Sequence, residues 1–417
     1  MASSHYRPFA SLALAICVAA CGATPVPPPS GTSVAAPPTA TSVAAPPTAS
    51  AEPEPWLSVD VPQPPAVADA PTLAPGYLCH PCHELAEDDL LGVGAWPEGF
   101  LAVGVRQPPS VAVAFTSPDG MRWTPLAGFP AQEGTAGLAV AASGTRTVVV
   151  GKGPDGAASW ASTGGAWTAA PAQAGLAAPS KAGAMTSVVA FGGGFVAGGY
   201  RDDPANVRSA AAVWRSDDGL TWRLDDAAGA FESGRIWGLA VRGGVVVAVG
   251  TSGDPVYGPA AAWRWTAADG WRRATLAPDD GGAMHAVAAT ATGFVAVGLN
   301  AHDNGGRVWT STDGLAWTAL PDGAVFHYFD LGVRMQAVAA GPGGLFAGGW
   351  RSDAGKGSAV AWSADAQGGA WTGPTWEAPF SGGEISGVAV SGGTVVAVGR
   401  LGYPDWNYAA AWLLVGG

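Results

Sequence analysis

In this sequence, the spacing that most directly suggests chemistry is that of a short cluster of cysteine and histidine residues. The segment Cys79-His80-Pro81-Cys82-His83 follows the C-x-x-C-H pattern, by which haem c is attached covalently. The surrounding chain is rich in proline, and no nearby Met or His on a predicted helix offers a second axial ligand. In an oxidising compartment the two thiols would form a disulfide. We predict a Cys79–Cys82 disulfide and no cofactor; haem c at Cys79, Cys82 and His83, or a Cys/His metal site, are the alternatives.

A second set of candidates is defined by position in a repeated pattern. Basic side chains follow five of seven apolar runs that close on glycine, and basic or aromatic side chains precede other apolar runs. If they share one face, they form a cationic collar suited to an anionic sugar, a carboxylate or a polar polymer. The predicted ligand-face residues are Arg106, Lys152, Arg201, Arg235, Trp237, His285, Arg334, Arg351 and Arg400, with Gln336 beside them.

The plainer interpretation of these side chains is that they end strands and form ion pairs in solvent. Their partners would be Asp202, Asp203, Asp303, Asp353 and Asp405. We prefer this interpretation, because ion pairs at protein surfaces are common and say little about function.

Signatures of enzymes are few. Asp88, Asp89 and Glu384 could act as paired glycosidase carboxylates, but nothing in the sequence fixes their separation. The six histidines show no metal-binding spacing, and neither a G-x-S-x-G motif nor a phosphate-binding loop occurs in a fitting context. We predict no catalytic residue and no metal site, so a binding role is favoured over catalysis.

The composition limits the elements that can position these residues. Of 417 residues 48% are hydrophobic and only 12% charged, which is ample for a large core. With 62 glycines and 35 prolines the chain favours many short strands joined by tight turns. The net charge of −12 argues against binding to nucleic acid.

A repeat of about 50 residues organises the chain from about residue 88 onward. Its anchor is an apolar run ending on glycine, and the seven anchors end at Gly104, Gly151, Gly199, Gly250, Gly298, Gly349 and Gly399. Another short strand precedes each anchor, and two more follow that carry tryptophans at matching positions. Four antiparallel strands per unit of this length are typical of a propeller blade. The fold class is therefore all-β: a seven-bladed β-propeller of four-stranded antiparallel blades.

The last repeat lacks its fourth strand, because the chain ends soon after Trp412. The segment Trp56-Leu57-Ser58-Val59-Asp60-Val61 alternates as a strand and begins with the expected tryptophan. We expect residues 56–61 to complete blade seven and to cover its open edge.

The turn between the third and fourth strands reads SPDGMRW (117–123), SDDGLTW (216–222) and STDGLAW (311–317). It resembles the Asp-box of sialidase-like propellers, one residue shorter than usual, and the glycine-ended anchors also resemble kelch repeats. We expect Ser and Asp to bond the turn backbone and Trp to fill the gap to the next blade. Blades two, four and six carry altered versions, interpreted as loss of this device. The resemblance implies a sialidase-like hydrolase as one option, although no Arg-Ile-Pro occurs near the first blade.

The N-terminus predicts export. Residues 1–21 combine Arg7 with an apolar stretch and end in Val18-Ala19-Ala20-Cys21, which resembles the lipobox of bacterial lipoproteins. The resemblance implies lipidation of Cys21; an ordinary cleaved signal with a chance cysteine is the alternative. Residues 22–55, rich in Pro, Ala, Thr and Ser, contain TSVAAPPTA twice and predict a disordered tether. The propeller then occupies 56–417.

Taken together, the sequence favours a monomeric, extracytoplasmic propeller that touches the bacterial cell membrane or envelope only through its N-terminal lipid. We expect it to act as a ligand- or protein-binding or scaffolding module, with a glycan or protein as ligand. The alternatives are a sialidase-like glycoside hydrolase acting on an anionic glycan and, from residues 79–83 alone, a c-type haem redox protein. Fold alone does not separate these options, because propellers host many activities.

Overall fold

The computed structural model describes residues 56–63 and 87–414, except 204–207, 226–230, 232, 254–257, 278–280, 301–304, 328–331, 354–355, 376–379, 381 and 403–407. Three predictions lie outside the described residues: the signal peptide with Cys21, the tether 22–55, and the segment 79–83 with Cys79 and Cys82. Among the residues described, no helix is long and apolar enough to span a membrane.

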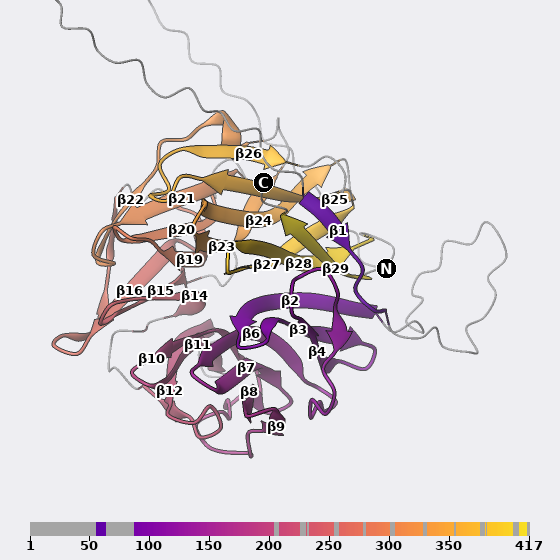
Figure 1. The fold of residues 1–417 in the computed structure, drawn as a ribbon. Coiled ribbons are helices and arrows are strands. Elements are labelled where there is room, and N and C mark those ends of the chain that lie inside the picture. Colours follow the sequence, from indigo (N-terminus) through magenta and orange to yellow (C-terminus); the bar gives the residue numbers. More distant parts are fainter. Residues whose placement is uncertain are drawn as a thin grey trace, which may run out of the picture. The chain divides into compact units, whose positions relative to one another are not determined.

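Seven antiparallel sheets form the seven blades of a β-propeller, numbered here in chain order (Figure 1). The innermost strands are β2 (Glu87–Trp96), β6 (Ala136–Ser143), β10 (Gly183–Phe191), β14 (Gly234–Arg242), β19 (Ala283–Ala289), β23 (Val333–Gly341) and β27 (Gly383–Ser391). Each contacts the innermost strand of the next blade, and β27 contacts β2, so the ring is closed. The predicted fold class and blade count are confirmed.

The remaining strands follow outward in each blade. The second strands are β3 (Gly99–Gln107), β7 (Arg146–Gly153), β11 (Gly194–Asp203), β15 (Val245–Ser252), β20 (Phe294–Leu299), β24 (Gly344–Asp353) and β28 (Thr394–Leu401). The third strands are β4 (Val111–Ser117), β8 (Gly156–Thr163), β12 (Arg208–Ser216), β16 (Ala260–Thr266), β21 (Gly306–Ser311), β25 (Lys356–Ala364) and β29 (Tyr408–Leu414). The outer strands are β5 (Thr124–Pro125), β9 (Ala166–Ala169), β13 (Arg223–Leu224), β17 (Gly270–Arg273), β22 (Ala316–Ala319) and β26 (Trp371–Thr375).

Two short elements connect the blades. Strand β18 (Thr275–Ala277) follows β17 and pairs in parallel with β22, which covers the outer edge of blade 5. A single 3₁₀ turn, η1 (Ala324–Phe326), leads from blade 5 to blade 6 and buries Phe326.

The second strands are apolar on both faces because neighbouring blades cover both of them. All six residues of β20, Phe294–Leu299, are buried, and Val148, Val149 and Val150 of β7 are fully inaccessible to solvent. Burial on both faces selects a continuous apolar run over alternation. This explains why the anchors of the repeat can be recognised in the sequence as continuous apolar runs.

Strand β1 (Trp56–Val59) closes the ring as expected. It pairs antiparallel with β29, with Trp56 opposite Leu414 and Val59 opposite Ala411, so the first and last described strands share one blade (Figure 1). The strand is shorter than the predicted 56–61, but Val61 beyond it is buried at 6% exposure. Blade 7 therefore has its fourth strand.

The turns after the third strands form the predicted local bonds. The Ser117 hydroxyl accepts the Gly120 amide at 2.8 Å, and the Asp119 carboxylate accepts the Met121 amide at 2.8 Å. Blade 6 keeps part of this device despite its longer turn, because the Trp371 indole donates to the Gly368 carbonyl at 2.9 Å. The interpretation of the altered turns as loss of the device is therefore wrong for blade 6.

The turn tryptophans fill a different gap from the one expected. The Trp222 indole of blade 3 donates to Ser159 of blade 2 at 2.8 Å, and Gly219 beside it packs on Val148. Trp222 therefore packs on the preceding blade, not on the next one. The turn of blade 3 folds back over the face that its third strand presents to blade 2. This places Trp222 against blade 2.

Candidate ligand-binding site at the mouth of the propeller

Every innermost strand carries a β-bulge at the same position. In each blade the register with the second strand shifts by one residue, as between Leu90 and Gly92 in β2 or between Ile236 and Gly238 in β14. A bulge leaves one residue out of the ladder and re-aims its side chain. The residues left out, named here the bulge ring, are Leu91, Leu138, Thr186, Trp237, His285, Gln336 and Ser386.

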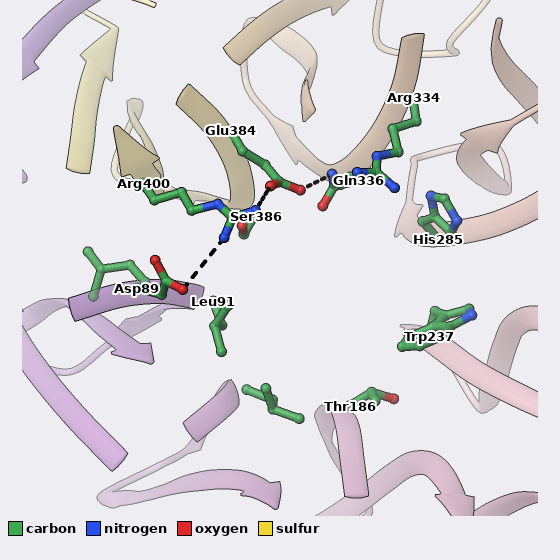
Figure 2. A pocket seen from close by; sticks show the side chains of 12 residues that line it. Asp89, Leu91, Thr186, Trp237, His285, Arg334, Gln336, Glu384, Ser386 and Arg400 are labelled. Carbon is green, nitrogen blue, oxygen red and sulfur yellow. Dashed lines mark hydrogen bonds and ion pairs between the residues drawn. The ribbon is translucent and has the colours of Figure 1, made fainter. Parts of the chain in front are cut away.

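All seven members of the bulge ring line one cavity of about 420 Å³ at the mouth of the propeller. Each is half-buried, and each comes from a different blade. Figure 2 shows the labelled members arranged around a common space, carried there by several strands. The cavity is therefore built by the repeat itself, with one side chain per blade.

The bulges explain the glycines that end the anchors. A Cβ atom on Gly104 would lie 1.8 Å from the Asp89 carbonyl oxygen, and one on Gly250 would lie 1.9 Å from the Arg235 carbonyl oxygen. Backbone atoms cannot yield at such distances, so only glycine fits opposite a bulge. The periodic glycine of the sequence is thus the signature of the bulge that aims each ring residue.

The bulge also brings neighbouring inner strands close together. The residue after each ring member is Gly, Ala or Ser, and a Cβ atom on Gly92 would lie 2.2 Å from the Leu138 carbonyl oxygen of the next blade. Direct hydrogen bonds cross some of these contacts. The Thr186 hydroxyl of blade 3 donates to the Ile236 carbonyl of blade 4 at 2.6 Å.

A polar network lies on one side of the cavity, across blades 6, 7 and 1. The Arg400 guanidinium donates to Glu384 at 2.7 Å and lies 3.7 Å from the Asp89 carboxylate. The Gln336 amide donates to the second oxygen of Glu384 (Figure 2). This group, named here the mouth network, comprises Asp89, Gln336, Glu384 and Arg400.

His285 and Arg334 lie next to this network. The His285 Nδ1 atom is 3.1 Å from the Met335 carbonyl, so the neutral ring donates its proton there. Burial, with the nearby charge of Arg334, lowers the pKa of His285 to about 4, against the raising effect of that hydrogen bond. The imidazole is therefore uncharged at neutral pH. The Arg334 guanidinium lies 4.7 Å from the ring centre of Trp350, its register partner on β24.

Four of the nine predicted ligand-face residues meet in the cavity: Trp237, His285, Arg334 and Arg400. Gln336, which the sequence placed beside them, also lines it. The other five do not line it: Arg106, Lys152, Arg201, Arg235 and Arg351.

Several of these five have local partners. Arg106 forms two 2.8 Å bonds to Asp88, whose side chain is completely buried, and this contact raises the pKa of Arg106. Arg201 donates to the Ala177 carbonyl at 2.6 Å, and Arg235 lies 3.7 Å from Asp202. Arg351 is buried, and Lys152 is exposed. Of the acidic partners expected in solvent, Asp202 is the one whose side chain is described.

Sequence reasoning did not select Leu91, Leu138, Thr186 or Ser386 as site residues. They resemble ordinary strand residues, and no single residue type occupies the position in every blade. A signal was nevertheless present: each stands before a small residue and about a dozen positions before an anchor glycine. Selection by residue type identifies Arg and His as site residues. The members of the bulge ring are identified instead by their position in the innermost strand.

No group of three or more His, Cys, Asp or Glu side chains within the described ranges could hold a metal ion. The turns with Asp119, Asp218 and Asp313 lie at the opposite ends of the strands from the mouth, because each follows a third strand that begins at the mouth.

Comparisons with known proteins extend to the fold. No protein-family model matches the sequence, and no curated protein matches it. Among solved structures, YCF48 bound to D1 peptide superposes with a TM-score of 0.53 at 13% identity, covering 88% of this chain and 97% of the other. YjhT gives 0.46 at 14% identity, covering 68% and 96%. The β-propeller domain of the trilobed protease from Pyrococcus furiosus gives 0.45 at 11% identity, covering 79% and 94%.

Proposed function

We propose that this protein is a lipid-anchored extracytoplasmic binding module that holds a ligand at the mouth of its propeller. The observation that carries the proposal is the convergence of seven bulge residues on one cavity. Side chains that point into an open cavity from rigid strands are typical of a binding site that is formed in advance.

The charges at the mouth favour binding over catalysis. Both oxygens of Glu384 accept hydrogen bonds, from Gln336 and from Arg400, so its carboxylate is already engaged within the chain. A general acid has to be within hydrogen-bond reach of its substrate. His285, with a pKa of about 4, is a weak base at neutral pH. The proposal therefore assigns these groups to recognition.

The structural comparison is consistent with a binding role but does not identify the ligand. YCF48 is a propeller whose structure contains a bound peptide. Since the two chains share 13% identity, we carry over the general role of the scaffold and no contact.

The lipid anchor rests on the sequence from Arg7 to Cys21 and on the tether that follows. The test is metabolic labelling with an alkyne-tagged fatty acid in a bacterial host, followed by membrane fractionation. We expect label and membrane association in the wild type, and neither in Cys21→Ala. Labelling that survives in the variant would contradict the anchor and leave the cavity proposal intact.

The binding role is tested by a thermal-shift screen of glycans, peptides and small metabolites against residues 52–417. Compounds that stabilise the wild type are measured again with Trp237→Ala and Gln336→Ala, which alter the cavity from two blades. We expect both variants to lose the shift while keeping their own melting transitions. Hits that are insensitive to both variants would contradict a site at the mouth.

The hydrolase alternative makes a separate prediction. Fluorogenic glycosides, including a sialoside, should show no turnover above the background rate. Turnover that Arg334→Ala abolishes would overturn the proposal and establish the sialidase-like alternative.

A further inference from the structure

We infer that the mouth binds a small monocarboxylate with an apolar or aromatic body, with the carboxylate on Arg334 and the body on Trp237, Leu91 and Leu138. This inference rests on the proposed function and adds the chemical class of the ligand.

Arg334 is the cation that is left for a ligand. None of the ion pairs among the described residues involves it; its recorded partner is the Trp350 ring, stacked 4.7 Å away. Its Nε atom is buried and makes no hydrogen bond to the described chain. An unmet buried donor is costly, and a carboxylate satisfies two guanidinium donors at once. Trp350 occupies a face of the group, which leaves its N–H edge for recognition.

The charges of the lining leave room for at most one negative charge on a ligand. Arg334 and Arg400 oppose Asp89 and Glu384, and His285 is neutral, so the lining carries no net charge by itself. Arg400 is already paired with Glu384 and Asp89. These two carboxylates repel an incoming anion and direct it toward Arg334. A dianion such as a phosphate monoester has no second uncompensated cation in this lining. A monocarboxylate places its single charge on Arg334, the lining cation that has no carboxylate partner among the described residues.

The apolar part of the lining begins beside the mouth network, at Asp89, and extends from blade 1 to blade 4. Leu90, Leu91, Leu138 and Trp237 form it, and in Figure 2 His285 lies between Arg334 and Trp237. Trp237 is held in place from behind: the Arg235 guanidinium lies 3.8 Å from the Tyr200 ring centre and 5.8 Å from that of Trp237.

Arg235 is itself fixed by its neighbours. It donates to Ser209 at 2.9 Å and lies 3.7 Å from Asp202. An aromatic surface that is ordered before binding costs a ligand little entropy. Trp237 therefore presents a preformed face for a flat or aliphatic group.

The size of the site excludes long chains from full enclosure. A cavity of about 420 Å³ is at the small end of the range for metabolite sites. It suits one ring with a short acid arm, so phenylacetate is a fitting probe.

The experiment is calorimetric titration of the wild type with a matched series. Phenylacetate carries both features, phenylacetamide lacks the charge, acetate lacks the ring, phenyl phosphate adds a charge, and phenethylamine reverses it. We expect phenylacetate to bind, and each of the other four to bind at least about tenfold more weakly. This series needs no variant, so it is independent of folding defects.

Variants then locate the contacts. Arg334→Gln should weaken phenylacetate at least about tenfold and leave phenylacetamide unchanged, whereas Trp237→Ala should weaken both. Arg122→Gln, which removes an exposed charge from a turn far from the mouth, is the control and should change nothing. Melting curves verify that each variant is folded.

The outcomes separate this inference from the proposed function. If phenylacetamide or phenethylamine binds as well as phenylacetate and Trp237→Ala abolishes it, the mouth is a binding site but the carboxylate class is wrong. If no probe binds up to about 10 mM, the carboxylate class is likewise wrong. The proposed function fails by its own test, when ligands from the screen ignore Trp237→Ala and Gln336→Ala.

Discussion

The Arg400 guanidinium donates a 2.7 Å hydrogen bond to Glu384, the residue directly opposite it in the register of β27 and β28. This contact within one blade cancels a charge that the sequence alone presents as available for a ligand. It also leaves Arg334, one blade away, as the cation of the cavity lining that has no carboxylate partner among the described residues. The electrostatic character of the mouth is therefore set by pairing across a sheet.

Removing the carboxylate of Glu384 should release Arg400. In Glu384→Gln the lining gains one net positive charge, so phenylacetate should bind about three to ten times more tightly and the preference against phenyl phosphate should shrink. Glu98→Gln is the control, because Glu98 is exposed and the change in net charge is the same. Calorimetric titration measures both. Equal gains in the two variants would show a general charge effect instead of a local one.

Deleting residues 52–62 should destabilise the propeller. The deletion removes β1 from blade 7 together with the buried Val61, and it exposes the edge of β29. We expect a fall in melting temperature of more than about 5 °C, read by circular dichroism. Deleting 32–40, one copy of the tether repeat, is the matched control and should leave the melting temperature unchanged. Equal melting of the two deletions would contradict closure by β1.

The two neighbouring aspartates of the blade 3 turn should differ sharply. Asp218 accepts the amides of Leu220 and Thr221 at 2.8 and 2.7 Å, whereas the Asp217 side chain is 96% exposed. Asp218→Ala should cost about 1–2 kcal/mol of unfolding free energy, and Asp217→Ala should cost almost none. Chemical denaturation measures both.

The contribution of this turn to stability at acid pH follows from the pKa of Asp218. Partial burial opposes ionisation of Asp218, but the amide hydrogen bonds prevail and lower its pKa below the ordinary value. Its stabilisation is therefore present above pH 4 and is lost as the pH falls below the ordinary carboxyl range. The difference in unfolding free energy between wild type and Asp218→Ala should therefore become smaller at such low pH. A difference that persists at low pH would contradict this assignment.

The close approach of the inner strands predicts a steric effect at Gly92. A methyl group there meets the Leu138 carbonyl of the next blade, so Gly92→Ala should cost more than about 2 kcal/mol. The added Cβ atom in Gly244→Ala meets nothing within 4 Å, so this control should be nearly neutral. Denaturant melts compare the two. A tolerated Gly92→Ala would mean that the bulges are not as tightly packed as described.

His285 should make stability depend on pH. Its folded-state pKa of about 4 lies below the ordinary value of 6.5, so the unfolded chain takes up the proton first. The stabilisation is complete above about pH 6.5 and is lost progressively as the pH falls toward 4, by no more than about 2–3 kcal/mol. His285→Gln should flatten that slope in melting experiments between pH 7 and pH 4. Identical slopes would show that the imidazole does not titrate in this way.

The architecture was largely legible in the sequence, for a physical reason. Strands covered on both faces need continuous apolar runs, and a bulge needs a glycine opposite it, so both constraints recur with every blade at Gly104, Gly151 and their equivalents. The missing fourth strand of the last repeat pointed to residues 56–61 in the same way. These are local requirements, and each leaves a fixed residue type at a fixed spacing.

The site could be predicted from the sequence only in part, because a site residue is defined by the direction of its side chain toward the cavity and not by its type. Arg106 and Arg334 both look like collar residues in the sequence, but Arg106 is held by the buried Asp88, whereas Arg334 reaches the cavity. Leu91 and Ser386 carry no chemical signature and are members of the bulge ring nonetheless. Which side chains converge depends on closing seven blades into one ring, a long-range condition. The sequence by itself determined the repeat, its strands and its closure, and only the tertiary structure decided which charges remain for a ligand.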